Sequence, residues 1–136
     1  MLGGVKLVLV RHAEAAPGEP DELRSLTPGG RDAARSLGEQ LAADDMRPDA
    51  VLTSPLLRAR ETGAELGRAL SVPAEPDERL APGATAESVL QLVKGRGDTV
   101  VVVGHQPDFG RIAAELTGGP EPPFPAGGTF ELQLDD

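Results

Sequence analysis

The run Thr99–Val103, with the sequence TVVVV, constrains the fold of this chain more than any other feature. Consecutive β-branched residues favour a strand, and neighbouring residues of a strand point to opposite faces of the sheet. Both faces of this strand must therefore be covered by other apolar residues. Strands of parallel sheets that carry helices on both sides are buried in this way. The run predicts a central strand of an α/β protein.

Segments with strand and helix character alternate along the rest of the chain. The apolar pattern predicts further strands at residues 5–10, 50–53 and 129–134, with a short one near Val72. The last of these alternates apolar and polar residues, which is typical of a strand at the edge of a sheet. Helices are predicted after Thr27-Pro28 to about residue 45, from Ser54-Pro55 to residue 70, over 85–94 and over 107–117.

This alternation predicts a three-layer α/β sandwich with a mostly parallel central sheet, helices on both faces and one edge strand. The chain has 136 residues, no internal repeat and no low-complexity linker, so we expect a single domain over residues 1–136. Ligands of such folds bind at the carboxyl ends of the strands.

Composition narrows the possible functions. The net charge of -9 argues against nucleic acid as a partner, because binding a phosphate backbone requires a basic face. No segment has the roughly 18 to 20 apolar residues that a membrane span needs, so no membrane partner is expected. The absence of cysteine excludes disulfides, thiolate nucleophiles and cysteine-based zinc sites. It fits a reducing compartment, and we expect the protein in the cytoplasm.

Basic side chains follow three of the predicted strands. Arg11 and His12 end the first strand, the second leads into a segment containing Arg58, and His105 follows the TVVVV strand. An arginine guanidinium binds phosphate oxygens two at a time and keeps its charge. A neutral imidazole can attack phosphorus when other groups stabilise the charge on the phosphoryl group. The four residues together predict a phosphate-binding site, with phosphate or sulfate as a ligand.

Each of these signals has an ordinary explanation when it is taken alone. A histidine after a strand is more often a structural hydrogen-bonding residue, and a lone arginine is more often solvated. Two histidines could also form half of a metal site, but Glu14 and Asp108 do not complete a known ligand spacing. The joint position of the two arginines and two histidines favours phosphate chemistry, and we expect neither a metal nor a cofactor.

Four segments, in this order, resemble the histidine phosphatase (phosphoglycerate mutase-like) superfamily: LVLVRHAEA, LTPGGRDAA, LTSPLLRARET and VVVVGHQPDFG. The similarity is closest to its SixA-type protein phosphohistidine phosphatases and extends from Val5 to the last strand. This resemblance implies that His12 becomes transiently phosphorylated. It implies that Arg11 and Arg58 bind phosphate, and that His105 is the second pocket histidine. The stretch from Asp21 to Thr27 resembles a D-x-x-R-x-L-T motif, which would place Arg24 at the pocket mouth, although a solvated loop arginine is an equal alternative.

The chain departs from the larger members of the superfamily where they carry a proton donor. The acid expected just after Leu80 is replaced by Ala81-Pro82, and Asp77 and Glu78 are the nearby candidates. An ester oxygen needs an acid to leave, which is worth roughly 10²- to 10⁴-fold in rate, whereas the nitrogen of phosphohistidine needs less help. The missing acid, together with the short chain, favours a phosphohistidine substrate on the surface of a protein.

Three functions therefore remain open. The first is a metal-independent phosphatase that hydrolyses phosphohistidine on a protein partner through phospho-His12; a histidine phosphotransfer domain and a phosphocarrier are both candidate partners. The second is a small-molecule phosphomonoesterase with the same nucleophile. The third is a phosphate- or phosphoprotein-binding module without turnover, which the presence of both His12 and His105 disfavours, because binding alone needs no nucleophile.

Overall fold

The computed structural model describes residues 4–135, so both ends of the predicted domain 1–136 lie outside the described residues. It contains a five-stranded sheet in the order β3-β2-β4-β1-β5. β1, β2, β3 and β4 run parallel, and β5 pairs antiparallel with β1 at the edge. The strands are β1 Val5–Arg11, β2 Ala50–Thr53, β3 Ala74–Pro76, β4 Thr99–Gly104 and β5 Thr129–Leu134. The predicted α/β sandwich with its mostly parallel sheet and edge strand is confirmed.

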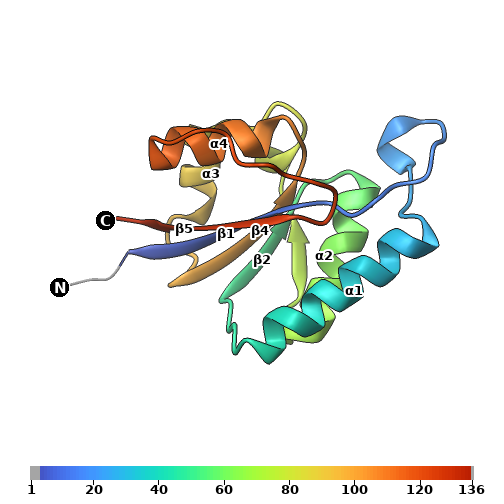
Figure 1. Cartoon of the computed structure of the whole chain (residues 1–136), viewed down its shortest axis with the longest axis horizontal. Coiled ribbons are helices and arrows are strands. Elements are labelled where there is room, and N and C mark those ends of the chain that lie inside the picture. Colours follow the sequence, from blue (N-terminus) through green and yellow to red (C-terminus); the bar gives the residue numbers. More distant parts are fainter. Residues whose placement is uncertain (1–3, 136) are drawn as a thin grey trace.

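Helices cover both faces of the sheet (Figure 1). α1 Pro28–Ala43 and α2 Leu57–Leu70 pack together on one face, and α3 Ala86–Val93 and α4 Asp108–Thr117 cover the other. Short 3-10 turns, η1 Asp21–Leu23 and η2 Glu78–Leu80, lie in two of the connections. In the described part of the chain, no helix combines the length and the apolar character needed to cross a membrane.

The valines of β4 explain why this strand is central. Val100 and Val102 are buried in the core beneath α3 and α4, whereas Val101 and Val103 are buried in the core beneath α1 and α2. β1 is divided in the same way between these two cores. Alternate side chains of a strand point to opposite faces, so a continuous apolar run supplies both cores at once.

The predicted start of α1 is confirmed, and the predicted start of α2 is wrong. Thr27 caps α1 as expected, because its Oγ1 accepts a hydrogen bond from Gly30 N at 2.8 Å. α2 begins only at Leu57, and its N-cap position, Leu56, has no side-chain cap. Ser54 does not cap the helix, because its hydroxyl accepts from Leu56 N at 3.2 Å, before the helix begins, and also contacts His105.

The connection after α2 also differs from the prediction. The short strand is at Ala74–Pro76 and not near Val72, because the backbone N–H of Val72 still closes the end of α2 by donating to Gly67 O at 3.0 Å. Only beyond this residue is the chain extended enough to pair with β2.

Candidate active site

The ends of β1, β2 and β4 bring the predicted site residues to one edge of the sheet. Arg11 is in register with Gly104, and His12 N donates to Gly104 O at 3.0 Å. Ser54 N donates to Val103 O at 2.9 Å, which places the end of β2 against the other side of β4. His12 and His105 therefore follow two neighbouring parallel strands, as the sequence predicts.

The two histidine rings lie edge to face, with 5.1 Å between their centroids and 62° between their planes. His12 Nδ1 lies 2.7 Å from the carbonyl oxygen of Ala13. A carbonyl only accepts hydrogen bonds, so Nδ1 carries the proton of the neutral ring. The lone pair then lies on Nε2, and His12 has the tautomer that a nucleophile attacking through Nε2 requires.

Burial and neighbouring positive groups favour the neutral form of both histidines. Burial lowers the pKa of His12 below its ordinary value; the hydrogen bond to Ala13 raises it, and the charges of Arg58 and Arg11 lower it further. Burial lowers the pKa of His105 to about 4, and the neighbouring His12 and Arg58 act in the same direction. A bound phosphate would oppose these effects, because a nearby negative charge favours the protonated ring.

Arg11 has one side-chain donor that is paired and one that is not. Its Nη1 donates to Phe124 O at 3.0 Å, whereas its Nε is buried and has no hydrogen-bond partner among residues 4–135. Buried donors are almost always paired, and an unpaired one suits a ligand oxygen. The loop before β5 also holds the backbone here, because Gly127 N donates to the carbonyls of Arg11 and His12 at 3.1 and 3.2 Å.

Arg58 lies in the first turn of α2 and is almost fully buried, with 7% of its surface exposed. Its guanidinium donates to two oxygens of Asp21, from Nη1 to the carbonyl at 2.9 Å and from Nη2 to Oδ2 at 3.2 Å. Arg24 donates to the other carboxylate oxygen of Asp21 at 3.0 Å and, through Nε, to Ala16 O at 2.8 Å. The hydrogen bond from Arg24 is the largest cause that lowers the pKa of Asp21, and the hydrogen bond from Arg58 is the next.

Ser54 and Thr62 contact the predicted site residues or their neighbours, although sequence reasoning missed both. Ser54 Oγ lies 2.8 Å from His105 Nε2. The hydroxyl of Thr62 donates to Arg58 O at 2.8 Å and accepts from Ala13 N at 3.0 Å, which joins the helix that carries Arg58 to the residue after His12. The only available signal was the position of Thr62 one helical turn after Arg58 in LTSPLLRARET.

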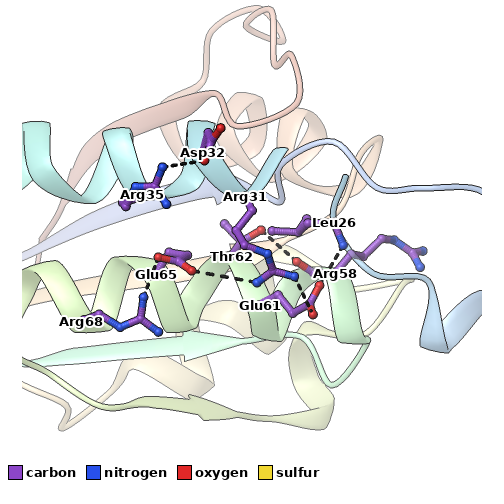
Figure 2. Close-up of polar contacts among 9 residues, drawn as sticks. All are labelled: Leu26, Arg31, Asp32, Arg35, Arg58, Glu61, Thr62, Glu65 and Arg68. Carbon is purple, nitrogen blue, oxygen red and sulfur yellow. Dashed lines mark hydrogen bonds and ion pairs between the residues drawn. The ribbon is translucent and has the colours of Figure 1, made fainter. Parts of the chain in front are cut away.

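A polar cluster between α1 and α2 fixes the loop that carries Asp21 and Arg24 (Figure 2). Glu61 accepts from Leu26 N at 2.8 Å and from Arg31 Nη2 at 3.1 Å. One carboxylate of α2 therefore binds both the end of this loop and the start of α1.

The two proton-donor candidates lie one strand farther out, after β3. The carboxylate of Asp77 accepts from the backbone N and the Nε and Nη2 of Arg79, at 2.9, 3.0 and 3.0 Å. This pairing with Arg79 lowers the pKa of Asp77. Glu78 is exposed on η2.

The other acids considered as metal ligands have local hydrogen bonds of their own. A carboxylate oxygen of Glu14 accepts from Thr27 Oγ1 at 2.9 Å, and Asp108 Oδ2 accepts from Gly83 N at 2.8 Å. Among residues 4–135, no three histidine or acidic side chains are grouped closely enough to hold a metal ion.

Comparison with known proteins places this chain in a family. Residues 7–82 match the model of the histidine phosphatase superfamily (branch 1). Phosphohistidine phosphatase SixA of Escherichia coli is 33% identical over 140 residues, which cover 97% of this chain and 87% of that protein. An uncharacterised protein of Mycobacterium tuberculosis is 38% identical over 112 residues, which cover 79% of this chain and 69% of that protein.

Solved structures agree with these sequence relatives. The structure of the protein histidine phosphatase SixA complexed with tungstate has a TM-score of 0.82 and 30% identity, and the match covers 96% of this chain and 97% of that one. The predicted resemblance to the SixA-type branch is thus confirmed. The chain belongs to the histidine phosphatase superfamily and is a phosphatase.

Proposed function

We propose that this phosphatase hydrolyses phosphohistidine on a protein partner, without a metal, through a phosphorylated His12. The observation that carries the proposal is the hydrogen bond from His12 Nδ1 to Ala13 O, which leaves the lone pair on Nε2 of a ring whose centroid lies 5.1 Å from that of His105. The names of its relatives support the substrate, since the Escherichia coli protein is named a phosphohistidine phosphatase. Tungstate, the ligand of the SixA structure, is a tetrahedral oxyanion like phosphate.

The proposed reaction has two displacement steps at phosphorus. In the first, the lone pair of His12 Nε2 forms a bond to phosphorus while the bond from phosphorus to the substrate imidazole breaks, and this ring leaves as neutral imidazole because its other nitrogen carries a proton. In the second, water attacks the phosphorus of phospho-His12, and inorganic phosphate leaves with the protons of that water as the neutral His12 ring is regenerated. Arg11 and Arg58 stabilise the oxygens of the transferring group, the first through its unpaired Nε.

His105 contributes a further hydrogen-bond donor in this proposal. Its pKa is lowered to about 4, chiefly by burial. A phosphoryl group carries negative charge and raises the pKa of a histidine beside it. We expect His105 to bind a proton together with the phosphoryl group and to donate it as a hydrogen bond to a phosphoryl oxygen.

The lack of a suitable acid favours phosphohistidine over a phosphate ester. The pKa of Asp77 is lowered by its pairing with Arg79, so its carboxyl group is ionised at neutral pH and makes a poor proton donor. The imidazole of phosphohistidine leaves with less assistance than an alkoxide does. An esterase that uses Asp77 or Glu78 is the alternative, and its ester turnover would be lost in Asp77→Asn or Glu78→Gln.

The physiological setting is also a proposal. A histidine phosphotransfer domain or a phosphocarrier in the cytoplasm would present the phosphohistidine, and residues 1–136 would act as one domain. Arg24 lies on the loop around η1, where its contacts with Asp21 and Ala16 hold it beside Arg58. From this position it would meet the partner at the pocket mouth.

The test is turnover of a phosphohistidine-containing carrier protein beside a panel of phosphomonoesters, with and without EDTA. His12→Ala should abolish turnover, and Arg58→Ala should reduce kcat/KM by about 10²- to 10³-fold, as loss of a transition-state donor does. Arg60→Ala is the matched control, because Arg60 lies two residues along the same helix and donates to Pro55 O at 2.9 Å. Activity that persists in His12→Ala, or that disappears with EDTA, would refute the proposal.

A further inference from the structure

Asp21 stands out because it places a carboxylate on the arginine that is proposed to bind the phosphoryl group. Its side chain is 60% exposed, whereas that of its partner Arg58 is 9% exposed. Its two carboxylate oxygens are divided between two arginines, with Oδ1 accepting from Arg24 and Oδ2 from Arg58. The bridge joins the loop around η1 to the first turn of α2.

A phosphoryl group bound in the site would accept hydrogen bonds from Arg58, and Asp21 already accepts hydrogen bonds from the same guanidinium. A guanidinium has five N–H donors, and Asp21 uses two of them, one through its backbone carbonyl and one through its carboxylate. The negative charge of Asp21 also reaches the pocket, where it raises the pKa of His105 against the effect of burial. An anion that binds Arg58 therefore lies near the negative charge of Asp21, and the two like charges repel each other.

We propose that Asp21 is a specificity-determining residue. Its carboxylate competes with the phosphoryl group for Arg58 and so weakens the binding of free phosphate. The inference rests on the proposed role of Arg58. Weak binding of the product lets phosphate leave after each turnover. A protein substrate offsets the same competition through contacts outside the pocket, which free phosphate lacks.

The alternative role for Asp21 is to hold Arg58 in position. The structure favours competition, because the backbone carbonyl of Asp21 already accepts from Arg58 Nη1 at 2.9 Å, and any residue at this position supplies that carbonyl. The carboxylate adds a second, longer contact of 3.2 Å from an exposed side chain. Replacing the carboxylate should thus keep the orientation of Arg58 and remove the competing charge.

The experiment measures the Kd of inorganic phosphate by calorimetry for the wild type, Asp21→Asn and Asp32→Asn. Asp32 is the matched control, since it pairs with Arg35, three residues away on the exposed surface of α1 (Figure 2). Asp21 pairs with Arg24 at the same spacing. Both variants change the net charge equally. Asp21→Asn should bind phosphate about three- to tenfold more tightly than the wild type, because the substitution removes one partly exposed ion pair with Arg58 and one charge repulsion with the anion. Asp32→Asn should bind phosphate with the same Kd as the wild type.

Phosphate binding by Asp21→Asn that is weaker than, or equal to, that of Asp32→Asn would overturn the inference. If Asp21→Asn has a lower melting temperature than the control, Asp21→Ser provides the same comparison without the amide. If neither the wild type nor Asp21→Asn binds phosphate, the result would instead refute the proposed function, because Arg58 would then fail to bind the anion even without the competing carboxylate. The two failures give different results in the same titration.

Discussion

Replacing Thr62 by valine should weaken both the fold and the catalytic step, because this hydroxyl joins the two halves of the site. Thr62 is fully buried, and it is the acceptor for the backbone N–H of Ala13, which is 1% exposed. Valine has nearly the same shape, so it opens no cavity but leaves that buried N–H without an acceptor. Such an unpaired donor costs about 1 to 3 kcal/mol. Loss of the hydroxyl donor at the carbonyl of Arg58 costs less free energy, because this carbonyl retains its hydrogen bond within the helix.

The catalytic effect follows from the position of Ala13. Its carbonyl fixes the tautomer of His12, and its N–H is held by Thr62. A peptide loosened at Ala13 presents His12 Nε2 in a less defined position, and misplacement of this kind lowers kcat by roughly tenfold or more. KM should change less, because the arginines that bind the phosphoryl group are still present.

Thr62→Ser is the matched control, because it keeps the hydroxyl and removes one methyl group. It should cost about 1 kcal/mol and leave kcat near that of the wild type. Urea denaturation gives the free energy of unfolding, and turnover of a small phosphoramidate at saturation gives kcat. If Thr62→Val proves as stable and as active as Thr62→Ser, the hydroxyl does not position His12 and the reasoning fails.

Three further predictions concern the pH profile, the packing of α2 and contact with a partner. Because burial and the flanking arginines lower the pKa of His12 below 6.5, the His12 ring followed by NMR should titrate with a midpoint below pH 6.5; a midpoint at pH 7 would contradict this. Gly63→Ala should lower the free energy of unfolding by about 1 to 3 kcal/mol in a thermal or urea melt, because the added carbon would clash with Thr53 Cγ2; an unchanged melt would contradict this. Leu23→Ser should raise KM for a phosphohistidine protein but not for a small phosphoramidate, because Leu23 is 58% exposed on η1, beside the site. The control Leu90→Ser changes a residue that is 40% exposed near the start of β1, and it should alter neither KM. Equal effects of the two variants would argue against partner contact at η1.

The fold was predictable because its main signals are local. The valines of Thr99–Val103 reveal burial on both faces from composition alone, and two opposite cores in the structure receive alternate residues of this strand. Strand ends then place His12 and His105 together without knowledge of any side-chain contact, since parallel strands share their carboxyl edge.

The parts that were missed depend on contacts between distant segments. Asp21 lies in a polar loop of the kind that is usually solvated, and nothing local shows that it reaches Arg58, 37 residues away. Ser54 precedes a proline and has the pattern of a helix cap, but nothing in that pattern shows that its hydroxyl also contacts His105, 51 residues away. Such residues are recognised only when the tertiary structure supplies the partner.

The central claim is that His12 Nε2 carries the phosphoryl group during turnover. The most direct test is rapid quenching of the protein with a ³²P-labelled phosphoramidate, followed by proteolysis and mapping of the acid-labile label. We predict label on His12 alone, bound through Nε2, and none in His12→Ala. Turnover without labelled protein, or label on His105, would contradict the account.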